Sequence, residues 1–198
     1  MEVVSPLSGW ESFYVIMGGA AAALTGLQFV VLVLSAEVNV IGNDTTTNAY
    51  ATPTIVHFCA VLFISAVLSV PWPALAGAAL ALAACGVAGF VYAIIVLRRA
   101  QRQTDYEPVL EDWIWHNALP LIGYAALFIA GLILQGQTVL SLFLSGGVAM
   151  LLLFVSIHNA WDSVVFIALQ RRQRQEGRGS DQQAPVTPSS AGSSVEEA

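Results

Sequence analysis

The tripeptide His-Asn-Ala (HNA) occurs twice in this chain and supplies two of its three histidines. Asp112 precedes His116 by four residues, and Asp162 follows His158 by four. Residues four apart share one face of a helix, so each of these histidines has a carboxylate within reach. A histidine beside a carboxylate can hold a proton, or it can bind a metal while the acid orients its ring.

The elements that would carry these residues are strongly apolar. Hydrophobic residues make up 57% of the 198-residue chain, and charged residues make up only 10%. Soluble domains contain about 25% charged residues, so this composition is typical of a membrane protein. The formal net charge of −6 argues against nucleic-acid binding, and the short basic clusters suit lipid headgroups instead.

The chain has five apolar runs whose lengths approach or exceed the roughly 20 residues that a helix needs to span a bilayer. They predict an all-α, polytopic membrane helix bundle over residues 1–170. Ser8 and Glu11 have capping-box spacing before the first run, which lacks the positive flank of a signal peptide. The second run opens with Thr52 and Pro53, a helix start with proline in its first position. The expected helices are 12–36, 53–70, 74–97, 119–134 and 138–169.

The arginines predict how this bundle is oriented. All basic residues are arginines, and they form two clusters, at 98–102 and 171–178, with two expected crossings between them. Both clusters therefore lie on one side, which the positive-inside rule assigns to the cytoplasm. The N-terminus is then outside and the C-terminus inside. Trp10 and Trp72 fall at the outer boundary and Trp161 at the inner one, as expected for aromatic belts.

The sequence makes further predictions for three segments, which are the C-terminal tail, the connection between the third and fourth runs, and the fifth run. Residues 171–198 are rich in Gln, Ser, Gly and Pro, which predicts a disordered cytoplasmic tail. The pattern of 106–117 predicts a short amphipathic helix in the inner interface. The fifth run is longer than a span requires. It crosses either from Thr138 or from about Val148, and Trp161 in the inner belt favours the first alternative.

Counting along the helices predicts a polar band at the cytoplasmic end. At a rise of about 1.5 Å per residue, His116 and His158 lie roughly 30 and 33 Å below the outer Gln-Gly-Gln turn. His57 lies roughly 21 Å below the outer Pro-Trp-Pro turn, inside the hydrocarbon, where an ionisable residue is a functional hypothesis by default. We therefore expect His57 to be the inner member of the site and the HNA pairs to form its mouth. The candidate residues are His57, His116, His158, Asp112, Asp162, Gln28, Asn117 and Asn159.

Several interpretations of this band stay open. Either HNA copy alone can be a set of polar residues that only marks the end of a helix. His57 can be a buried neutral histidine that donates a hydrogen bond to a carbonyl. His57, His116, His158 and Asp162 are also enough ligands for zinc or iron, although no H-x-x-x-H or H-E-x-x-H motif occurs. The cofactor is therefore unknown. If the helix continues through Pro120, the carbonyl of His116 loses its usual backbone donor.

Small residues recur at every fourth position in two of the expected helices. Such ridges let helix backbones approach closely in lipid, either within one subunit or between subunits. Cys59 and Cys85 lie inside apolar runs, and we interpret them as small packing residues rather than disulfide partners. The ridge residues are Gly18, Ala22 and Gly26 in the first helix and Gly77, Ala81, Cys85 and Gly89 in the third.

The segment WESFYVIMGGAAAALTGLQFVVLVL, at 10–34, carries a resemblance to other proteins. It is similar to the opening helix of a group of uncharacterised bacterial multi-pass inner-membrane proteins. The resemblance is clearest over this first helix. It implies a location in the bacterial inner (plasma) membrane and implies no activity.

Three functional classes fit these observations, and the favoured one is an oligomeric permeation or proton-linked module with a His/Asp site at its cytoplasmic end. The alternative is a membrane interaction or assembly protein without transport or catalysis, and the third is a membrane metalloprotein. No phosphate-binding glycine loop and no G-x-S-x-G motif occurs in the sequence, which weighs against an enzyme. The expected partners are the lipid bilayer and further copies of the chain or other membrane proteins, and no nucleic acid is expected.

The predicted orientation can be tested with reporter fusions. Fusions at Ala51, Arg102 and Ala198 should report cytoplasm, and fusions at Pro71 and Gln137 should report periplasm, because the two arginine clusters lie on one side. A periplasmic signal at Ala198 would overturn this orientation.

Overall fold

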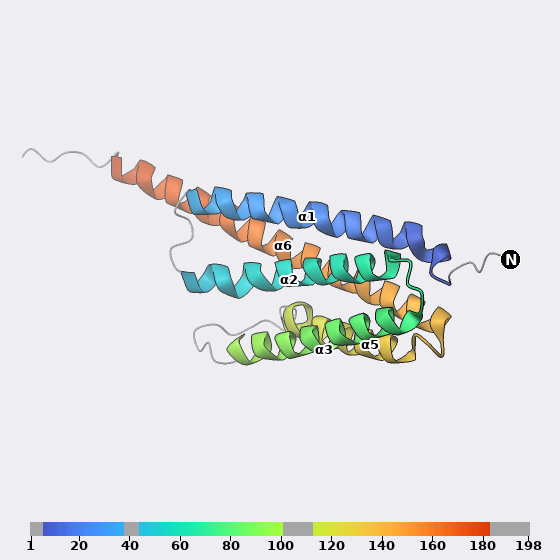
Figure 1. Cartoon of the computed structure of the whole chain (residues 1–198). Coiled ribbons are helices and arrows are strands. Elements are labelled where there is room, and N and C mark those ends of the chain that lie inside the picture. Colours follow the sequence, from blue (N-terminus) through green and yellow to red (C-terminus); the bar gives the residue numbers. More distant parts are fainter. Residues whose placement is uncertain (1–5, 38–43, 101–112, 183–198) are drawn as a thin grey trace, which may run out of the picture.

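A computed structural model describes residues 6–37, 44–100 and 113–182, and within them the chain is an all-α bundle of five long helices without β-strands (Figure 1). This architecture confirms the predicted all-α helix bundle. A 3-10 turn, η1 (Ser8–Trp10), precedes the first helix, and a π-helical turn, η2 (Ile114–Ala118), leads directly into α5. The long helices are α1 (Glu11–Glu37), α2 (Asp44–Ser69), α3 (Leu75–Ala100), α5 (Leu119–Ile133) and α6 (Thr138–Gln182).

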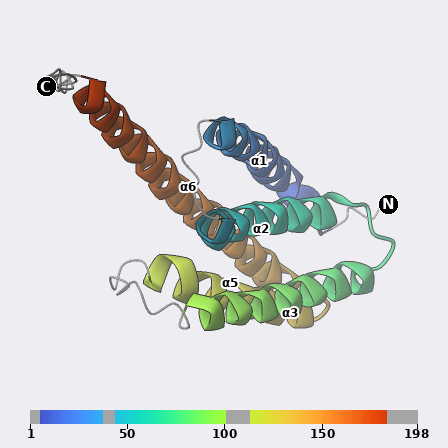
Figure 2. The same cartoon turned by 90° about the vertical axis from the view of Figure 1, so that its left-hand side faces the viewer.

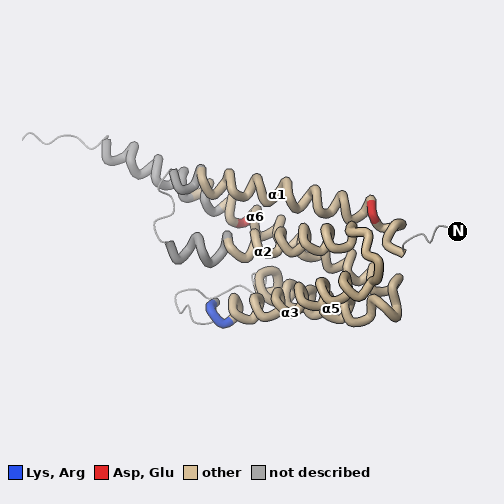
Figure 3. The backbone as a smooth tube through the Cα atoms, in the orientation of Figure 1, with Lys and Arg blue, Asp and Glu red and all other residues tan. Residues whose placement is uncertain are grey.

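Each long helix contributes a stretch that is long and apolar enough to cross a membrane, and five such stretches indicate a multi-pass membrane protein. Figure 3 marks charged residues along the backbone, and those in the described part of the chain lie toward the ends of the bundle. Glu11 is in the first turn of α1, and Arg98 and Arg99 are in the last turn of α3, at the end that we call the arginine end. The candidate spans are Ser8–Val33, Thr52–Ser69, Leu75–Arg99, Ile114–Ile133 and Thr138–Val165.

Helices α2 and α6 hold the bundle together. Helix α2 packs against α1 and α6, while α5 packs against α3 and α6 (Figures 1 and 2). Buried side-chain hydrogen bonds fix two of these neighbours. The Tyr14 hydroxyl of α1 donates to the Leu142 carbonyl of α6 over 2.9 Å, and the Ser141 hydroxyl of α6 donates to the Ala130 carbonyl of α5 over 2.7 Å.

Two helices extend beyond the expected bounds. Helix α2 begins at Asp44 and contains Pro53 inside it, whereas the sequence predicted a start at 53. Its candidate span still begins at Thr52, so the additional turns precede the apolar stretch. Helix α6 continues to Gln182, beyond the expected end at 169, and the disordered tail from 171 stays a prediction. Arginine and glutamine, which dominate 170–175, are good helix formers. Residues 106–112 of the predicted amphipathic helix lie outside the described residues.

The first turns of α6 lie inside the bundle. Ser141, Leu142 and Ser145 are buried, and the contacts of the first two to α5 and α1 have just been described. The structure therefore favours a crossing that begins at Thr138 over one that begins near Val148. Figure 2 shows α6 crossing the bundle obliquely and running past its neighbours at the arginine end.

Glycines set the closest approach between helices, and they coincide only in part with the predicted ridges. A methyl group added at Gly86 of α3 would lie 2.5 Å from the Phe128 backbone nitrogen, and one at Gly131 of α5 would lie 2.6 Å from that of Ala83. The sequence analysis missed both of these glycines. The α3–α5 interface is therefore the place where backbone meets backbone.

The residues of the predicted ridges divide by environment. Gly18 faces Ser65 of α2, and Gly89 faces the Tyr124 ring of α5, so both pack within one subunit. Gly77 lies under the Trp72 ring at the α2–α3 turn. Gly26 has no neighbour within 4 Å of an added methyl group. Ala22 is exposed, Ala81 and Cys85 pack against the core, and Cys59 is exposed, with both cysteines free.

The environments of Gly86 and Gly26 predict different effects of the same substitution to alanine. Gly86→Ala should lower the free energy of unfolding in detergent by about 1–3 kcal/mol, because the methyl group forces two backbones apart. Gly26→Ala is the matched control and should leave stability unchanged or slightly raised. Equal melting temperatures for the two variants would show that α3 and α5 do not pack as described.

Candidate functional site

The two HNA segments meet at the arginine end of the bundle. The indole ring of Trp115 in η2 stacks on the imidazole of His158 in α6, with ring centroids 4.3 Å apart and an interplanar angle of 25°. Trp115 directly precedes the first HNA, and His158 is the first residue of the second. The repeated tripeptide therefore belongs to two segments that touch.

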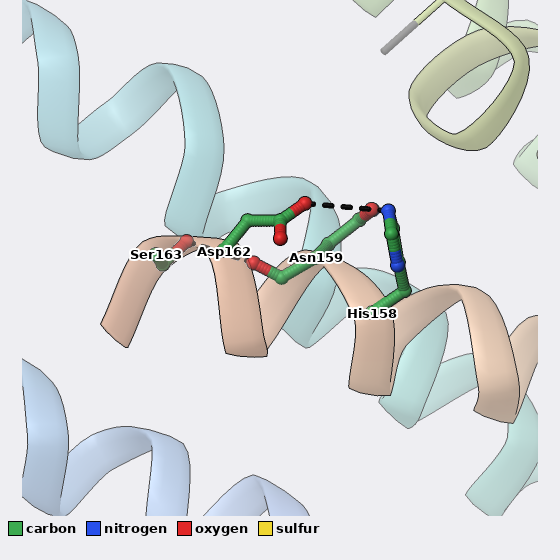
Figure 4. A network of polar contacts seen from close by, with 4 residues as sticks. All are labelled: His158, Asn159, Asp162 and Ser163. Carbon is green, nitrogen blue, oxygen red and sulfur yellow. Dashed lines mark hydrogen bonds and ion pairs between the residues drawn. The ribbon is translucent and has the colours of Figure 1, made fainter. Parts of the chain in front are cut away.

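The second HNA segment contains the expected ion pair. His158 Nε2 lies 3.3 Å from Asp162 Oδ2, and Figure 4 shows the two side chains turned toward each other from successive turns of α6. Their side chains are 29% and 47% exposed, so this pair lies at the rim of the bundle. The mirrored pair of Asp112 with His116 cannot be placed, because Asp112 lies outside the described residues.

His57 is the buried member of the site. It is 2% exposed on α2, and its Nδ1 lies 2.8 Å from the hydroxyl of Tyr124 on α5. Which of the two groups donates depends on the histidine tautomer. The sequence analysis missed Tyr124. A tyrosine within an apolar membrane helix was the available signal, because a buried tyrosine hydroxyl usually has a hydrogen-bond partner.

The η2 turn brings the first HNA against the second. Trp115 touches His158, and His116 follows Trp115 directly in the chain. The η2 turn also leads into α5, which carries Tyr124, the partner of His57. His57 is buried, whereas His116 and His158 are half-buried. The depth order of the three histidines in a membrane stays a prediction.

Pro120 gives a physical reason for the π-helical geometry of η2. Proline has no backbone N–H, so Pro120 cannot donate a hydrogen bond to the carbonyl four residues earlier, which is that of His116. In a π-helix a carbonyl accepts from the N–H five residues later, so the donor for the His116 carbonyl becomes Leu121 instead of Pro120. The Leu119 N–H bonds the Ile114 carbonyl in this register. The helix therefore continues through the proline, and π turns of this kind are frequent at functional sites.

Both HNA asparagines bury amide atoms without a hydrogen-bond partner. Asn159 is 2% exposed, and neither its Oδ1 nor its Nδ2 is paired. The Oδ1 of Asn117 is likewise buried and unpaired. Each unpaired buried polar group costs about 1–3 kcal/mol, and native structures contain few of them. The backbone carbonyl of Asn159 does accept a hydrogen bond, from the Ser163 hydroxyl over 2.9 Å (Figure 4).

Other predicted members are not joined to this site by the described contacts. Gln28 is buried on α1, and no described contact connects it to the histidines. Among the described residues, no three His, Cys, Asp or Glu side chains come together in a group that could hold a metal ion. Of the metal candidates His57, His116, His158 and Asp162, the described contacts pair His158 with Asp162 and place His57 against Tyr124 instead.

Comparison of the chain with protein families, with curated proteins and with solved structures gives no match. The geometry of the site is therefore the basis for the function proposed below.

The His57–Tyr124 contact predicts a specific effect of removing one hydroxyl. Tyr124→Phe should lower the free energy of unfolding by about 1–3 kcal/mol, because it leaves a buried imidazole nitrogen without its partner. It should also shift the ¹⁵N resonance of His57 Nδ1. Tyr92→Phe on α3 makes the same chemical change at a half-buried position and is the control. An unshifted His57 signal in Tyr124→Phe would contradict the described hydrogen bond.

Proposed function

We propose that this protein is an oligomeric, proton-linked permeation module of the bacterial inner membrane. The observation that carries the proposal is the joining of the two HNA segments, since it brings Trp115, the neighbour of His116, against the His158–Asp162 pair at one end of an apolar bundle. Histidine is the side chain whose ordinary titration falls between about pH 5 and 8. Ionisable residues within membrane helices mark proton and ion pathways.

The arrangement supports a stepwise role for its members. The His158–Asp162 pair lies at the rim, where the two side chains are 29% and 47% exposed. The Trp115 ring lies flat against the His158 imidazole and joins this pair to η2. The η2 turn leads directly into α5, whose Tyr124 hydroxyl pairs with the buried His57. The exposed pair and the buried histidine therefore belong to elements that are in contact or consecutive in the chain.

The proposed location and orientation have two supports. The first helix resembles bacterial inner-membrane proteins, as described above for 10–34. Arg98 and Arg99 lie at the end of the bundle from which α6 also leaves toward its arginine-rich continuation (Figures 1 and 3). By the positive-inside rule this end faces the cytoplasm, with the N-terminus outside and the C-terminus inside. The histidine site then opens toward the cytoplasm.

One surface feature favours the second candidate, a membrane interaction or assembly protein. Helix α6 exposes an apolar stripe whose members follow one another at intervals of seven, four, three, four and three residues, the heptad spacing of a coiled-coil seam. This seam fits another copy of α6 or a helix of another membrane protein. It serves equally the oligomer of the first proposal and a protein whose whole role is assembly. Its large side chains are Phe143, Met150, Phe154, Ile157, Trp161 and Val164.

Proton flux into liposomes separates the two candidates. The purified protein should carry protons faster than protein-free liposomes do, and His57→Ala should reduce the rate about a hundredfold, the scale of a positioned proton-transfer group. Ser69→Ala, at the opposite end of α2, is the control and should conduct like the wild type. Wild-type flux equal to that of protein-free liposomes would reject the proton-linked proposal and leave the assembly protein as the better account.

A further inference from the structure

The strongest unexplained feature of the described residues is the pair of asparagines in the two HNA segments. Asn159 is almost fully buried with both amide atoms unpaired, and Asn117 contributes a further buried, unpaired amide atom. These atoms belong to η2 and α6, which touch through Trp115 and His158. Exchanging the side-chain nitrogen and oxygen of Asn159 would not change this description, because both atoms lack a partner.

We infer that Asn117 and Asn159 form a small hydrated site between η2 and α6 through which the buried His57 exchanges protons with solvent at the arginine end. Asn159 offers one acceptor and two donor hydrogens, and Asn117 offers at least one further group. Water is the smallest molecule that both donates and accepts hydrogen bonds. Buried water typically makes about three hydrogen bonds to polar groups of this kind.

The surroundings of the asparagines favour water over larger or charged ligands. The stacked rings of Trp115 and His158 hold η2 close to α6, which limits the size of any occupant. The described part of the chain gathers no set of acidic, imidazole or thiolate ligands for a multivalent metal ion. A neutral molecule of water size satisfies the amides without introducing an uncompensated charge.

Each of the two asparagines directly follows a histidine in the sequence, which places the hydrated site next to groups that exchange protons. Asn159 follows His158, which is partly exposed and paired with Asp162. Asn117 lies in η2, which leads directly into α5, the helix whose Tyr124 hydroxyl pairs with His57. Water held by the two asparagines would therefore lie between the exposed and the buried ends of the site. This inference deepens the proposed proton-linked function and identifies the route by which His57 would be reached.

The first experiment measures water contact in the unaltered protein. In lipid nanodiscs containing the full chain, magnetisation transferred from water should reach the Asn159 side-chain amide protons in NMR spectra. Absence of this transfer would overturn the hydrated site. A shift of the same signals on adding sodium, potassium or ammonium chloride, without water transfer, would also overturn it in favour of a monovalent cation.

The second experiment measures proton exchange at His57. Asn159→Leu keeps a similar volume and removes both unpaired polar atoms, so it should slow hydrogen–deuterium exchange of the His57 ring by about tenfold or more without lowering the melting temperature. Asn117→Leu should act in the same direction and provides a second variant if the first does not fold. Ser145→Ala is the control, because it removes another buried, unpaired oxygen of α6 well away from the HNA segment.

The outcomes separate this inference from the proposed function. Unchanged His57 exchange in Asn159→Leu, with raised stability, would show that the asparagine is only a packing defect and would overturn the inference. Water contact and slowed exchange support the hydrated site even if wild-type liposomes carry no protons, a result that would instead reject the proton-linked proposal.

Discussion

A polar group inside an apolar helix bundle must find its partner within the protein, because neither lipid nor a packed core supplies one. This constraint governs how the five helices are arranged. Tyr14 reaches the Leu142 carbonyl, Ser141 reaches the Ala130 carbonyl, and His57 reaches the Tyr124 hydroxyl. Each of these buried bonds joins two different helices, and together they connect α1 to α6 and α5 to both α6 and α2.

The histidine site is a consequence of the same requirement at the arginine end. Helix α5 enters the bundle through a proline, and the π turn before it carries Trp115 and His116 on consecutive residues. Trp115 contacts His158 of α6, and the same turn leads into α5, whose Tyr124 pairs with the histidine of α2. The site therefore depends on a local departure from α-helical geometry. The two asparagines are the members for which this arrangement supplies no protein partner.

The sequence predicted those features that depend on one segment at a time. Hydropathy and length gave the five crossings, and the four-residue spacing anticipated the pairing of His158 with Asp162. Contacts between segments were predicted less well. The stacking of Trp115 on His158 and the pairing of His57 with Tyr124 depend on how each helix is rotated about its axis. Glycine spacing alone likewise failed to identify Gly86 and Gly131, since the partner helix determines which glycine is needed.

The central claim is that the two HNA segments form one site, and a double-mutant cycle between Trp115 and His158 tests it most directly. The free energies of unfolding of Trp115→Ala, His158→Ala and the double variant should show a coupling of about 0.5–1.5 kcal/mol, as expected for stacked rings. The cycle of His158→Ala with Trp72→Ala, a tryptophan in the α2–α3 turn at the opposite end of the bundle, should be additive. Additive effects of Trp115→Ala and His158→Ala would contradict the single site.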